Sequence, residues 1–358
     1  MIGGQAWRHG APSHLAGMPR FPRRALLALA LPAPALAQAV SAFDGALAMA
    51  GAMPNLRTLI VAQHGAPVLE RAFRGPGLDR PANIKSASKS VLATLAGIAL
   101  ERGVLRDLDQ PIGPILGHGI PPEADPRVRE ITIRQLLAMR AGLERTSGQN
   151  YGRWVNSRDW LRFALTRPME DQPGGRMIYS TGTTHILGAV LARASGRSLH
   201  ALAQDWLGAP LGIAIPDWPR APEGLHFGGN EMLMSPRGLL AFAECWRNEG
   251  RHAGRQVVPR DFRQDAWTPQ AQSEWSGQLY GLGWWIAEAR GQPVYFAWGF
   301  GGQMAYVVPG LGLSVVMTAN PDVPRVRGQV QEMHALLVQG ILPAFATGTD
   351  AALTPRAG

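Results

Sequence analysis

The chain has 358 residues, of which 46% are hydrophobic and 17% charged, with 43 Gly, 29 Pro and a single Cys. This length and composition predict a large core in one or two domains and exclude disordered, collagen-like and coiled-coil classes. Cys245 cannot form an internal disulfide, and no CxxC pair, HExxH sequence or Cys/His cluster offers metal ligands. We therefore expect no metal and no cofactor, and any chemistry must come from side chains.

The formal net charge of +9 overstates how basic the folded part is. Four arginines (Arg8, Arg20, Arg23 and Arg24) lie in the first 37 residues, which contain no Asp or Glu, and removing their charge leaves +5. The other arginines are scattered among carboxylates, which is typical of a solvated surface. We therefore expect no nucleic-acid partner.

The first 37 residues have the form of a targeting segment. A basic stretch at 20–24 precedes a short apolar run at 25–31, and Ala35-Leu36-Ala37 has the small-x-small form that a signal peptidase requires. The paired arginines resemble a twin-arginine signal, and an ordinary secretory signal also fits, with either Met1 or Met18 as the start. We predict a signal peptide over 1–37, a periplasmic or secreted protein and no stable membrane anchor. A cytosolic protein with a disordered N-terminus is the alternative.

Runs rich in β-forming residues predict a hairpin near each end of the chain. The first combines Leu56–Gln63 with Pro67–Phe73, and the second combines Gln303–Pro309 with Leu313–Ala319. Val330–Phe345 then has the pattern of a helix. Between the hairpins lie mostly helical segments with Pro/Gly connectors.

This order of elements predicts an α/β (α+β) fold in which one antiparallel sheet, flanked by helices, is built from both chain ends. A mostly helical subdomain would be inserted at about 105–285, with a cleft between it and the sheet. The domain would span 38–345, and we expect a disordered tail over 346–358.

The chemistry starts from the lysines, because Lys85 and Lys89 are the only two among 35 Lys and Arg residues. Arginine cannot lose its proton in a protein, whereas a buried lysine can, so a position that needs a neutral amine cannot be Arg. Lys89 stands three residues after Ser86, and residues so spaced share one helix face. An amine with a pKa near 10.4 is neutral in only about one molecule per few thousand at pH 7, so burial would have to lower it.

The context of this pair favours a nucleophile. Ser86 opens the segment 86–102, which is apolar nearly all round and therefore predicts a buried helix. Free backbone N–H groups and the positive potential at its start would favour an oxyanion. The alternative is an ordinary N-cap serine beside a snorkelling lysine.

Further motifs follow Ser86-Ala87-Ser88-Lys89 in a familiar order. They are Ile131-Thr132-Ile133-Arg134-Gln135-Leu136-Leu137 with Ala141-Gly142-Leu143, Pro173-Gly174-Gly175 leading to Tyr179-Ser180-Thr181, and His185-Ile186-Leu187-Gly188. From about Asn55 to Asn320 the chain thus resembles the serine β-lactamase and penicillin-binding superfamily, in its class C and esterase branch. Three later stretches are similar to 6-aminohexanoate-dimer hydrolase-like members: Gly228-Gly229-Asn230-Glu231-Met232, Tyr280-Gly281-Leu282-Gly283-Trp284-Trp285 and Ala297-Trp298-Gly299-Phe300-Gly301-Gly302-Gln303.

The resemblance implies a β-lactamase/transpeptidase-like fold and a role for each matching residue. Ser86 would be the acylated nucleophile, Lys89 the amine that deprotonates it, and Tyr179 the phenol that shuttles a proton. We expect an ammonium group nearby to push this phenol toward phenolate. The backbone N–H groups of Phe300, which follows Gly299, and of Ser86 would form an oxyanion hole. A core tyrosine and a tight glycine turn are the alternatives for Tyr179 and Gly299.

Departures from the family pattern bear on substrate. The second motif often reads Tyr-x-Asn, but Thr181 stands at the Asn position, and Ala297-Trp298-Gly299 lacks the usual Lys or His. Because these groups would bind the amide and carboxylate of a β-lactam or peptide, we expect weak or absent β-lactamase activity. A Trp-Gly third motif is found in esterase members. We expect Trp298 to line an apolar pocket, with Trp154, Trp160, Trp284 and Trp285 as further candidates for which core packing is the alternative.

The sequence therefore predicts an exported serine hydrolase of small esters or amides. A strict amidase or D-peptidase shares the same machinery, and a penicillin-binding module that binds without turnover is a further alternative. An α/β-hydrolase is excluded because no serine lies in a G-x-S-x-G elbow.

Overall fold

The computed structural model describes residues 42–322, 328–346 and 352–356. An eight-stranded antiparallel sheet has the order β2-β1-β12-β11-β10-β9-β8-β7, so the first strand of the chain pairs with the last strand. The predicted segment 1–37 lies outside the described residues. The strands are β1 (Leu56–Gln63), β2 (Ala66–Ala72), β3 (Ala82–Asn83), β4 (Leu233–Met234), β5 (Arg251–His252), β6 (Arg255–Gln256), β7 (Ala271–Gln272), β8 (Leu279–Tyr280), β9 (Trp285–Ala289), β10 (Gln292–Gly299), β11 (Gln303–Val308) and β12 (Leu313–Ala319).

Helices cover both faces of the sheet, and further helices form the region farthest from β1 and β2. The helices are α2 (Asp44–Ala52), α3 (Ser88–Glu101), α4 (Gly113–Leu116), α5 (Ile133–Leu137), α6 (Tyr151–Val155), α7 (Trp160–Leu165), α8 (Thr181–Ser195), α9 (Leu199–Ala203), α10 (Ala209–Leu211), α11 (Pro236–Arg247), α12 (Arg260–Ala266) and α13 (Gln329–Ala335). Shorter helical turns are η1 (Lys85–Ala87), η2 (Gly117–Gly119), η3 (Pro126–Glu130), η4 (Gly148–Asn150), η5 (Gln204–Gly208), η6 (Pro309–Leu311), η7 (Leu336–Ile341) and η8 (Leu342–Ala344).

Both faces of the sheet are buried, which explains why β1 and β12 are apolar without alternation. Along β1, Leu59 and Val61 belong to a core cluster with α2, α13 and η7, whereas Ile60 and Ala62 face the cluster that contains α3 and α11. Side chains alternate between the faces of a strand, so a strand covered on both sides is apolar throughout. The predicted hairpins, the fold class and the sheet built from both chain ends are confirmed.

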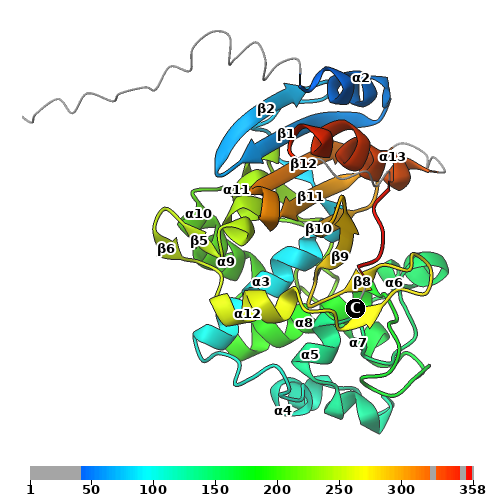
Figure 1. The fold of residues 1–358 in the computed structure, drawn as a ribbon. Helices are drawn as coiled ribbons and strands as arrows, with labels where there is room; N and C mark the ends of the chain where they lie inside the picture. The colour runs from blue at the N-terminus through cyan, green and yellow to red at the C-terminus, as the bar shows by residue number, and fades with distance from the viewer. Residues whose placement is uncertain (1–41, 323–327, 347–351, 357–358) are drawn as a thin grey trace, which may run out of the picture.

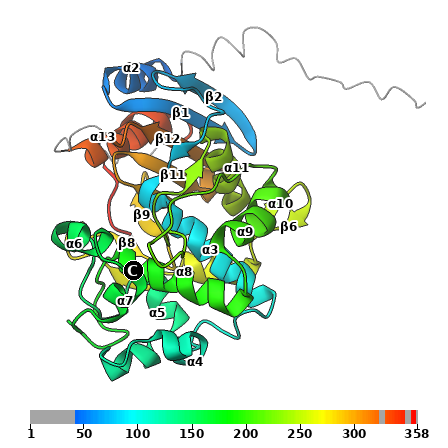
Figure 2. The same cartoon turned by 180° about the vertical axis from the view of Figure 1, so that it is seen from behind.

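The inserted helical region is less separate than predicted. Figures 1 and 2 show α4, α5 and α7 at the end of the molecule opposite β1, β2 and α2, with α3 between them. However, α11 packs on β11 and β12, and the short strands β7 and β8 extend the sheet. The range 105–285 therefore includes parts of the sheet layer. The sequence did not indicate this, because the two-residue strands β7 and β8 are too short to give a period-2 pattern.

The prediction of a disordered tail over 346–358 is wrong for residues 352–356. Thr354 exchanges two backbone hydrogen bonds with Glu288 in β9, with N···O distances of 2.8 and 2.9 Å. The strand β8 pairs only with Trp285 and Ile286, so the rest of that edge of β9 has free backbone groups. The tail supplies hydrogen-bond partners for these backbone groups. This pairing orders the tail although its sequence has no core-forming pattern.

Candidate active site

Ser86 lies in the turn η1, directly before the buried helix α3. The segment leading to it is fixed on both sides: β3 pairs with β4, and the Ile84 N–H donates to the Met232 carbonyl at 3.0 Å. Lys85 adopts a left-handed φ of 48°, and its N–H donates to Asn83 Oδ1 at 2.8 Å. A non-glycine residue in this region is strained, and its neighbours hold it there. This sharp turn leaves Ser86 partly exposed at the start of an otherwise buried helix.

Lys89 points its amine at Ser86 from one turn further along. Its Nζ atom lies 3.1 Å from Ser86 Oγ, 3.2 Å from Thr181 Oγ1 and 2.9 Å from the Gly229 carbonyl oxygen. The residue is 2% exposed, and no carboxylate in the described part of the chain forms an ion pair with it. A neutral amine has two N–H donors and one lone pair, so these three neighbours can be satisfied by two donated bonds and one accepted from the Ser86 hydroxyl.

Burial lowers the pKa of Lys89 from 10.5 to about 7. Desolvation is the cause, because removing an ammonium group from water disfavours its charged form and no counter-charge compensates here. A large fraction of Lys89 is therefore neutral near pH 7. This is the property that a base for Ser86 requires.

Lys85, the other lysine, has a different environment. Its Nζ atom lies 2.9 Å from Glu231 Oε1, and Asn83 Nδ2 donates to the second carboxylate oxygen of Glu231 at 2.5 Å. Asn230, the neighbour of Glu231, donates to the Tyr151 hydroxyl at 3.2 Å. Asn230 and Glu231 thus stabilise the loop that presents the Gly229 carbonyl to Lys89. Sequence reasoning missed Gly229, whose φ of 76° and contact with Thr184 leave no room for a Cβ.

Tyr179 completes the group around Ser86. Its hydroxyl is hydrogen-bonded to the Ser86 side chain, and the Lys89 amine lies 5.3 Å from the centre of its ring. The ring stacks on Trp285 at a centroid distance of 5.5 Å. Burial raises the pKa of Tyr179 above its usual value, and this effect exceeds the opposing effect of its hydrogen bond with Ser86. The expected shift toward phenolate is therefore wrong, because desolvation of the buried phenol dominates.

Thr181 connects the site to a residue that sequence reasoning missed, Ser147. The two hydroxyl oxygens lie 3.1 Å apart, and the Thr181 N–H donates to Ser147 Oγ at 2.9 Å. The preceding Thr146 accepts from the Gly182 N–H at 2.8 Å. These hydroxyls cap the start of α8 from a distant loop, since the N-cap residue Ser180 makes no side-chain capping bond. The adjacent hydroxyl pair Thr146-Ser147 is the only signal in the sequence.

The third motif brings the end of β10 against the nucleophile turn. A Cβ at Gly299 would lie 2.1 Å from the Ile84 carbonyl oxygen, so only glycine allows the strand to pass this closely. Phe300 follows directly, with 49% of its surface exposed, and Trp298 is half-buried. The structure thus brings the segment containing Gly299 and Phe300 to the turn that carries Ser86.

Aromatic side chains form a wall beside Tyr179. The Trp298 ring lies 5.4 Å from Trp285 and 5.3 Å from Trp275, which is 59% exposed. Trp275 and Tyr179 also line a cavity of about 340 Å³ whose other walls carry Glu144, Arg145, Glu170, Arg176 and Glu274 among others. This cavity beside Tyr179 is therefore lined by both aromatic and charged side chains. Trp275 lies outside every motif, so no sequence signal identified it.

The remaining tryptophan candidates belong to the core. Trp154 and Trp284 have no exposed surface, and Trp160 is 8% exposed. Trp154 and Trp160 pack around His185, whose Nε2 lies 3.1 Å from Glu223 Oε1. Core packing, the alternative interpretation, is therefore correct for these three tryptophans, and only Trp285 and Trp298 lie beside the site.

Within the described residues, no group of three metal-ligating side chains occurs and no helix is both long and apolar enough to cross a bilayer.

Comparison with known families assigns the chain to one group. A family model described as Beta-lactamase matches residues 36–339. The chain belongs to the beta-lactamase family. The matched range includes the nucleophile turn, the start of α8 and the end of β10, and the predicted membership of the serine β-lactamase and penicillin-binding superfamily is confirmed.

Solved structures similar to this family member include hydrolases of several kinds. A protein named as a 6-aminohexanoate-dimer hydrolase from Bacillus anthracis is 17% identical, with a TM-score of 0.64, over 80% of this chain and 78% of its own. EstCE1, a hydrolase with promiscuous acyltransferase activity, is 18% identical with a TM-score of 0.66, over 85% and 99%. A D-stereospecific amidohydrolase from Streptomyces sp. is 21% identical with a TM-score of 0.62, over 83% and 97%. At these identities the similarity shows the fold.

Proposed function

We propose that this protein is a serine hydrolase that cleaves small, largely uncharged esters or amides through an acyl-enzyme on Ser86. The observation that carries the proposal is the buried Lys89 amine, 3.1 Å from Ser86 Oγ, with a pKa lowered to about 7 and no carboxylate partner among the described residues. An N-cap serine beside a snorkelling lysine would place the ammonium in water, whereas Lys89 is 2% exposed.

The first step follows from the states of the two groups. Neutral Lys89 accepts the hydroxyl proton as Ser86 Oγ attacks the carbonyl carbon, which gives a tetrahedral intermediate and an ammonium group. The oxyanion would be bound by the backbone N–H groups of Ser86 and Phe300, since Gly299 allows β10 to approach the turn.

Tyr179 acts on the leaving group. Because its pKa is raised, it is a neutral phenol that can donate its proton to the departing alkoxide or amine, and the Lys89 ammonium can then restore that proton. Water attacks the acyl-enzyme by the same route in reverse, with a proton passing to Lys89, which releases the acid and free Ser86.

The walls of the site favour an apolar substrate group. Trp275 and Phe300 are two of the three large hydrophobic side chains that are exposed in the described part of the chain, and both lie beside the site. Exposed aromatics in a cleft are typical of ligand contact. Thr181 and Trp298 replace groups that would bind an amide and a carboxylate, so esters are placed before β-lactams and peptides as substrates.

Two alternatives use the same residues. A strict amidase or D-peptidase would hydrolyse the amide analogue of an ester at an equal or higher rate. A penicillin-binding module without turnover would form a stable Ser86 adduct that does not decay.

We also propose that the protein is exported to the periplasm or beyond by the segment 1–37. The support is the sequence pattern of basic, apolar and small residues. Fractionation of cells that express the full chain would test this. Export of the wild type and its loss in Arg23→Lys/Arg24→Lys would identify a twin-arginine signal.

The deciding experiment is hydrolysis of p-nitrophenyl butyrate by the chain from Gln38 onward, beside Ser86→Ala. Loss of activity by several orders of magnitude in the variant is expected for a nucleophile. Equal activity in both proteins would contradict the assignment of Ser86. Nitrocefin turnover as efficient as that of the ester would contradict the substrate preference.

A further inference from the structure

The segment 82–89, which carries the nucleophile Ser86, lies against the segment 229–234. At one end the two segments pair as the short strands β3 and β4. At the other end, Lys89 donates from its Nζ atom to the Gly229 carbonyl at 2.9 Å. The position of the second segment therefore affects both the nucleophile turn and the base.

Three side chains form a closed set of hydrogen bonds between these segments, which we call the Asn83–Lys85–Glu231 triad. Lys85 Nζ lies 2.9 Å from Glu231 Oε1, and Asn83 Nδ2 donates to Oε2 of the same carboxylate at 2.5 Å. Asn83 Oδ1 in turn accepts from the Lys85 N–H at 2.8 Å. Each oxygen of the carboxylate thus has its own donor, and both donors come from the segment that leads into the nucleophile.

The two charged members of the triad have strained backbones. The angle φ is 48° at Lys85 and 61° at Glu231, in the left-handed region that residues other than glycine rarely adopt. Such conformations persist only where surrounding contacts hold them. Lys85 directly precedes Ser86, and Glu231 follows Gly229 by two residues. If the triad were broken, both turns could relax, and the Ser86 hydroxyl and the Gly229 carbonyl would move away from Lys89.

The triad also explains why residue 85 is a lysine in a chain whose other cations are almost all arginines. Lys85 and Lys89 are the only two lysines among 35 Lys and Arg residues, and only Lys89 has a role as a base. A guanidinium group would donate to both carboxylate oxygens of Glu231 and compete with Asn83 for one of them. The ammonium group of Lys85 needs only one oxygen and leaves the other to Asn83.

We propose that the Asn83–Lys85–Glu231 triad positions Ser86 and its base for proton transfer. This inference rests on the proposed function and adds three positioning residues to it. The triad acts through the nucleophile and the base and does not bind the substrate. Its loss should therefore lower kcat and leave KM nearly unchanged.

Hydrolysis of p-nitrophenyl butyrate by the chain from Gln38 onward tests the triad with two variants. In Glu231→Gln one carboxylate oxygen becomes an NH₂ group, so one of the two donors loses its acceptor. In Lys85→Arg the charge is kept, but the guanidinium displaces the Asn83 amide. Each variant should lose about tenfold or more in kcat, and a thermal melt should show that Lys85→Arg is as stable as the wild type. An ion pair that only stabilised the fold would keep full activity in Lys85→Arg.

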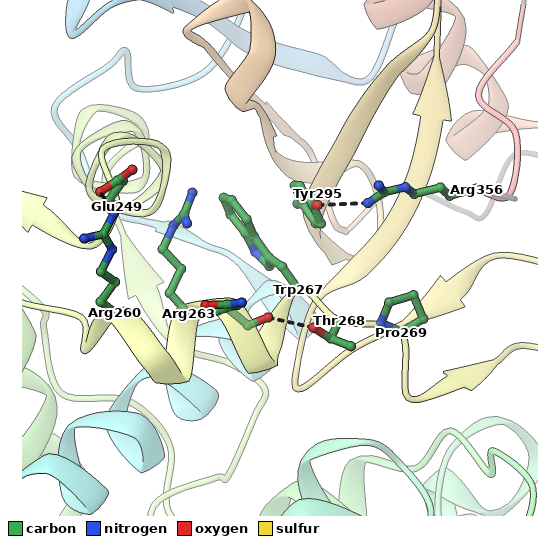
Figure 3. Close-up of a pocket in the computed structure, with 9 residues that line it drawn as sticks. Glu249, Arg260, Arg263, Trp267, Thr268, Pro269, Tyr295 and Arg356 are labelled. Carbon is green, nitrogen blue, oxygen red and sulfur yellow. Dashed lines mark hydrogen bonds and ion pairs between the residues drawn. The ribbon is translucent and has the colours of Figure 1, made fainter. Parts of the chain in front are cut away.

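Glu249→Gln is the matched control. Glu249 also adopts a left-handed φ, of 54°, and forms an ion pair with Arg260 at 2.9 Å. Figure 3 shows this pair at one end of a cavity of about 520 Å³, which shares no lining residue with the cavity beside Tyr179. Because the pair is remote from the nucleophile turn, its loss should leave both kcat and KM unchanged.

Chemical rescue separates positioning from a failure to fold. Lys85→Cys should lose activity, and its thiolate can displace bromide from 2-bromoethylamine, which restores an ammonium group on a side chain of nearly the same length. This alkylation should recover most of the lost kcat. Cys245, the only cysteine of the natural chain, is not expected to react, because its thiol is buried and burial raises its pKa to about 12. The wild type treated with the same reagent is the control.

Three results would overturn the inference. They are an unchanged kcat in Glu231→Gln, an unchanged kcat in Lys85→Arg, and no recovery of activity in Lys85→Cys protein whose alkylation is complete by mass spectrometry. The proposed function fails through a different result, which is equal activity of Ser86→Ala and the wild type. Loss of activity in Ser86→Ala together with full activity in the triad variants would therefore contradict the triad alone.

Discussion

The Thr181 hydroxyl lies 3.2 Å from the Lys89 amine, at the position where related sequences often have Asn. A hydroxyl can accept a hydrogen bond from the amine as an amide oxygen does, but it has no NH₂ group to donate to a substrate. The replacement therefore keeps the contact that positions Lys89 and removes a contact that would recognise an amide. This agrees with a site that retains acyl transfer and prefers esters.

Thr181→Val should lower kcat on p-nitrophenyl butyrate. The valine keeps the shape of the side chain but loses one hydrogen bond to Lys89 and one to Ser147, each worth about 0.5–1.5 kcal/mol. We expect a fall of about tenfold in kcat with little change in KM, because the amine and not the substrate loses a partner. Thr181→Ser, which retains the hydroxyl, is the matched control. An unchanged kcat in Thr181→Val would show that the hydroxyl does not position the base.

Lys89→Met should abolish activity and stabilise the fold. The pKa of Lys89 is about 7 in the folded protein and near 10.5 when unfolded, so between these pH values the unfolded chain binds more protons and stability rises with pH. Each pKa unit corresponds to about 1.4 kcal/mol, so the penalty reaches several kcal/mol below pH 7. The gain in free energy of unfolding for Lys89→Met should be largest below pH 7 and vanish above about pH 10.5. Urea unfolding at several pH values would measure it.

Lys85→Met is the matched control for that experiment. It leaves the Glu231 carboxylate without its cation, at a position only partly exposed, so stability should fall instead of rising. If both lysine variants changed stability in the same direction, burial without a counter-charge would not be the distinguishing feature of Lys89.

The pH dependence of kcat/KM should be a single rise with a midpoint near pH 7. Lys89 is the base only when neutral, and its pKa is about 7, so activity is lost as the pH falls through that value. The raised pKa of Tyr179 predicts no loss near pH 10. Tyr179→Phe should lower the plateau without moving the midpoint. A bell-shaped profile with a fall at pH 9–10 would be evidence against a neutral phenol as the donor.

The sequence predicted most of the fold because its apolar runs were long. The strands Leu56–Gln63 and Leu313–Ala319 have the expected bounds, and the two-sided burial of the sheet makes such runs unmistakable. The two-residue strands β7 and β8 are too short to show an alternating hydrophobic pattern. The pairing of Thr354 with Glu288 depends on backbone groups that nearly every residue has. Such features arise from tertiary context, which a local pattern does not contain.

The candidate site could be predicted where spacing reflects helix geometry, as it does for Ser86 and Lys89. Ser147 and Gly229 could not be predicted, since each acts through a hydroxyl or carbonyl brought in from a distant loop. The charge state of Tyr179 was predicted wrongly for a physical reason. Burial, which the sequence does not show directly, lowers the pKa of the amine and raises the pKa of the phenol, so both shifts favour the neutral form.

Gly299→Ala should destabilise the protein strongly. The added Cβ would lie 2.1 Å from the Ile84 carbonyl oxygen and 2.8 Å from Gln303 Cβ, so the end of β10 would have to move away from the nucleophile turn. Overpacking of this kind costs about 1–3 kcal/mol, and activity should fall further because the oxyanion donors separate. Gly152→Ala in α6, where nothing lies within 4 Å of the added atom, should instead be neutral or stabilising. Equal melting temperatures for the two variants would contradict the close approach.

Thr354→Pro should lower the melting temperature by removing one of the two backbone bonds that attach the tail to β9. The Thr354 N–H donates to the Glu288 carbonyl at 2.9 Å, and proline has no N–H to replace it. A net loss of about 1 kcal/mol corresponds to a few degrees in a domain of this size. Thr354→Ala keeps both backbone bonds and should melt close to the wild type. Identical melting temperatures for the wild type and both variants would mean that the tail does not pair with the sheet in solution.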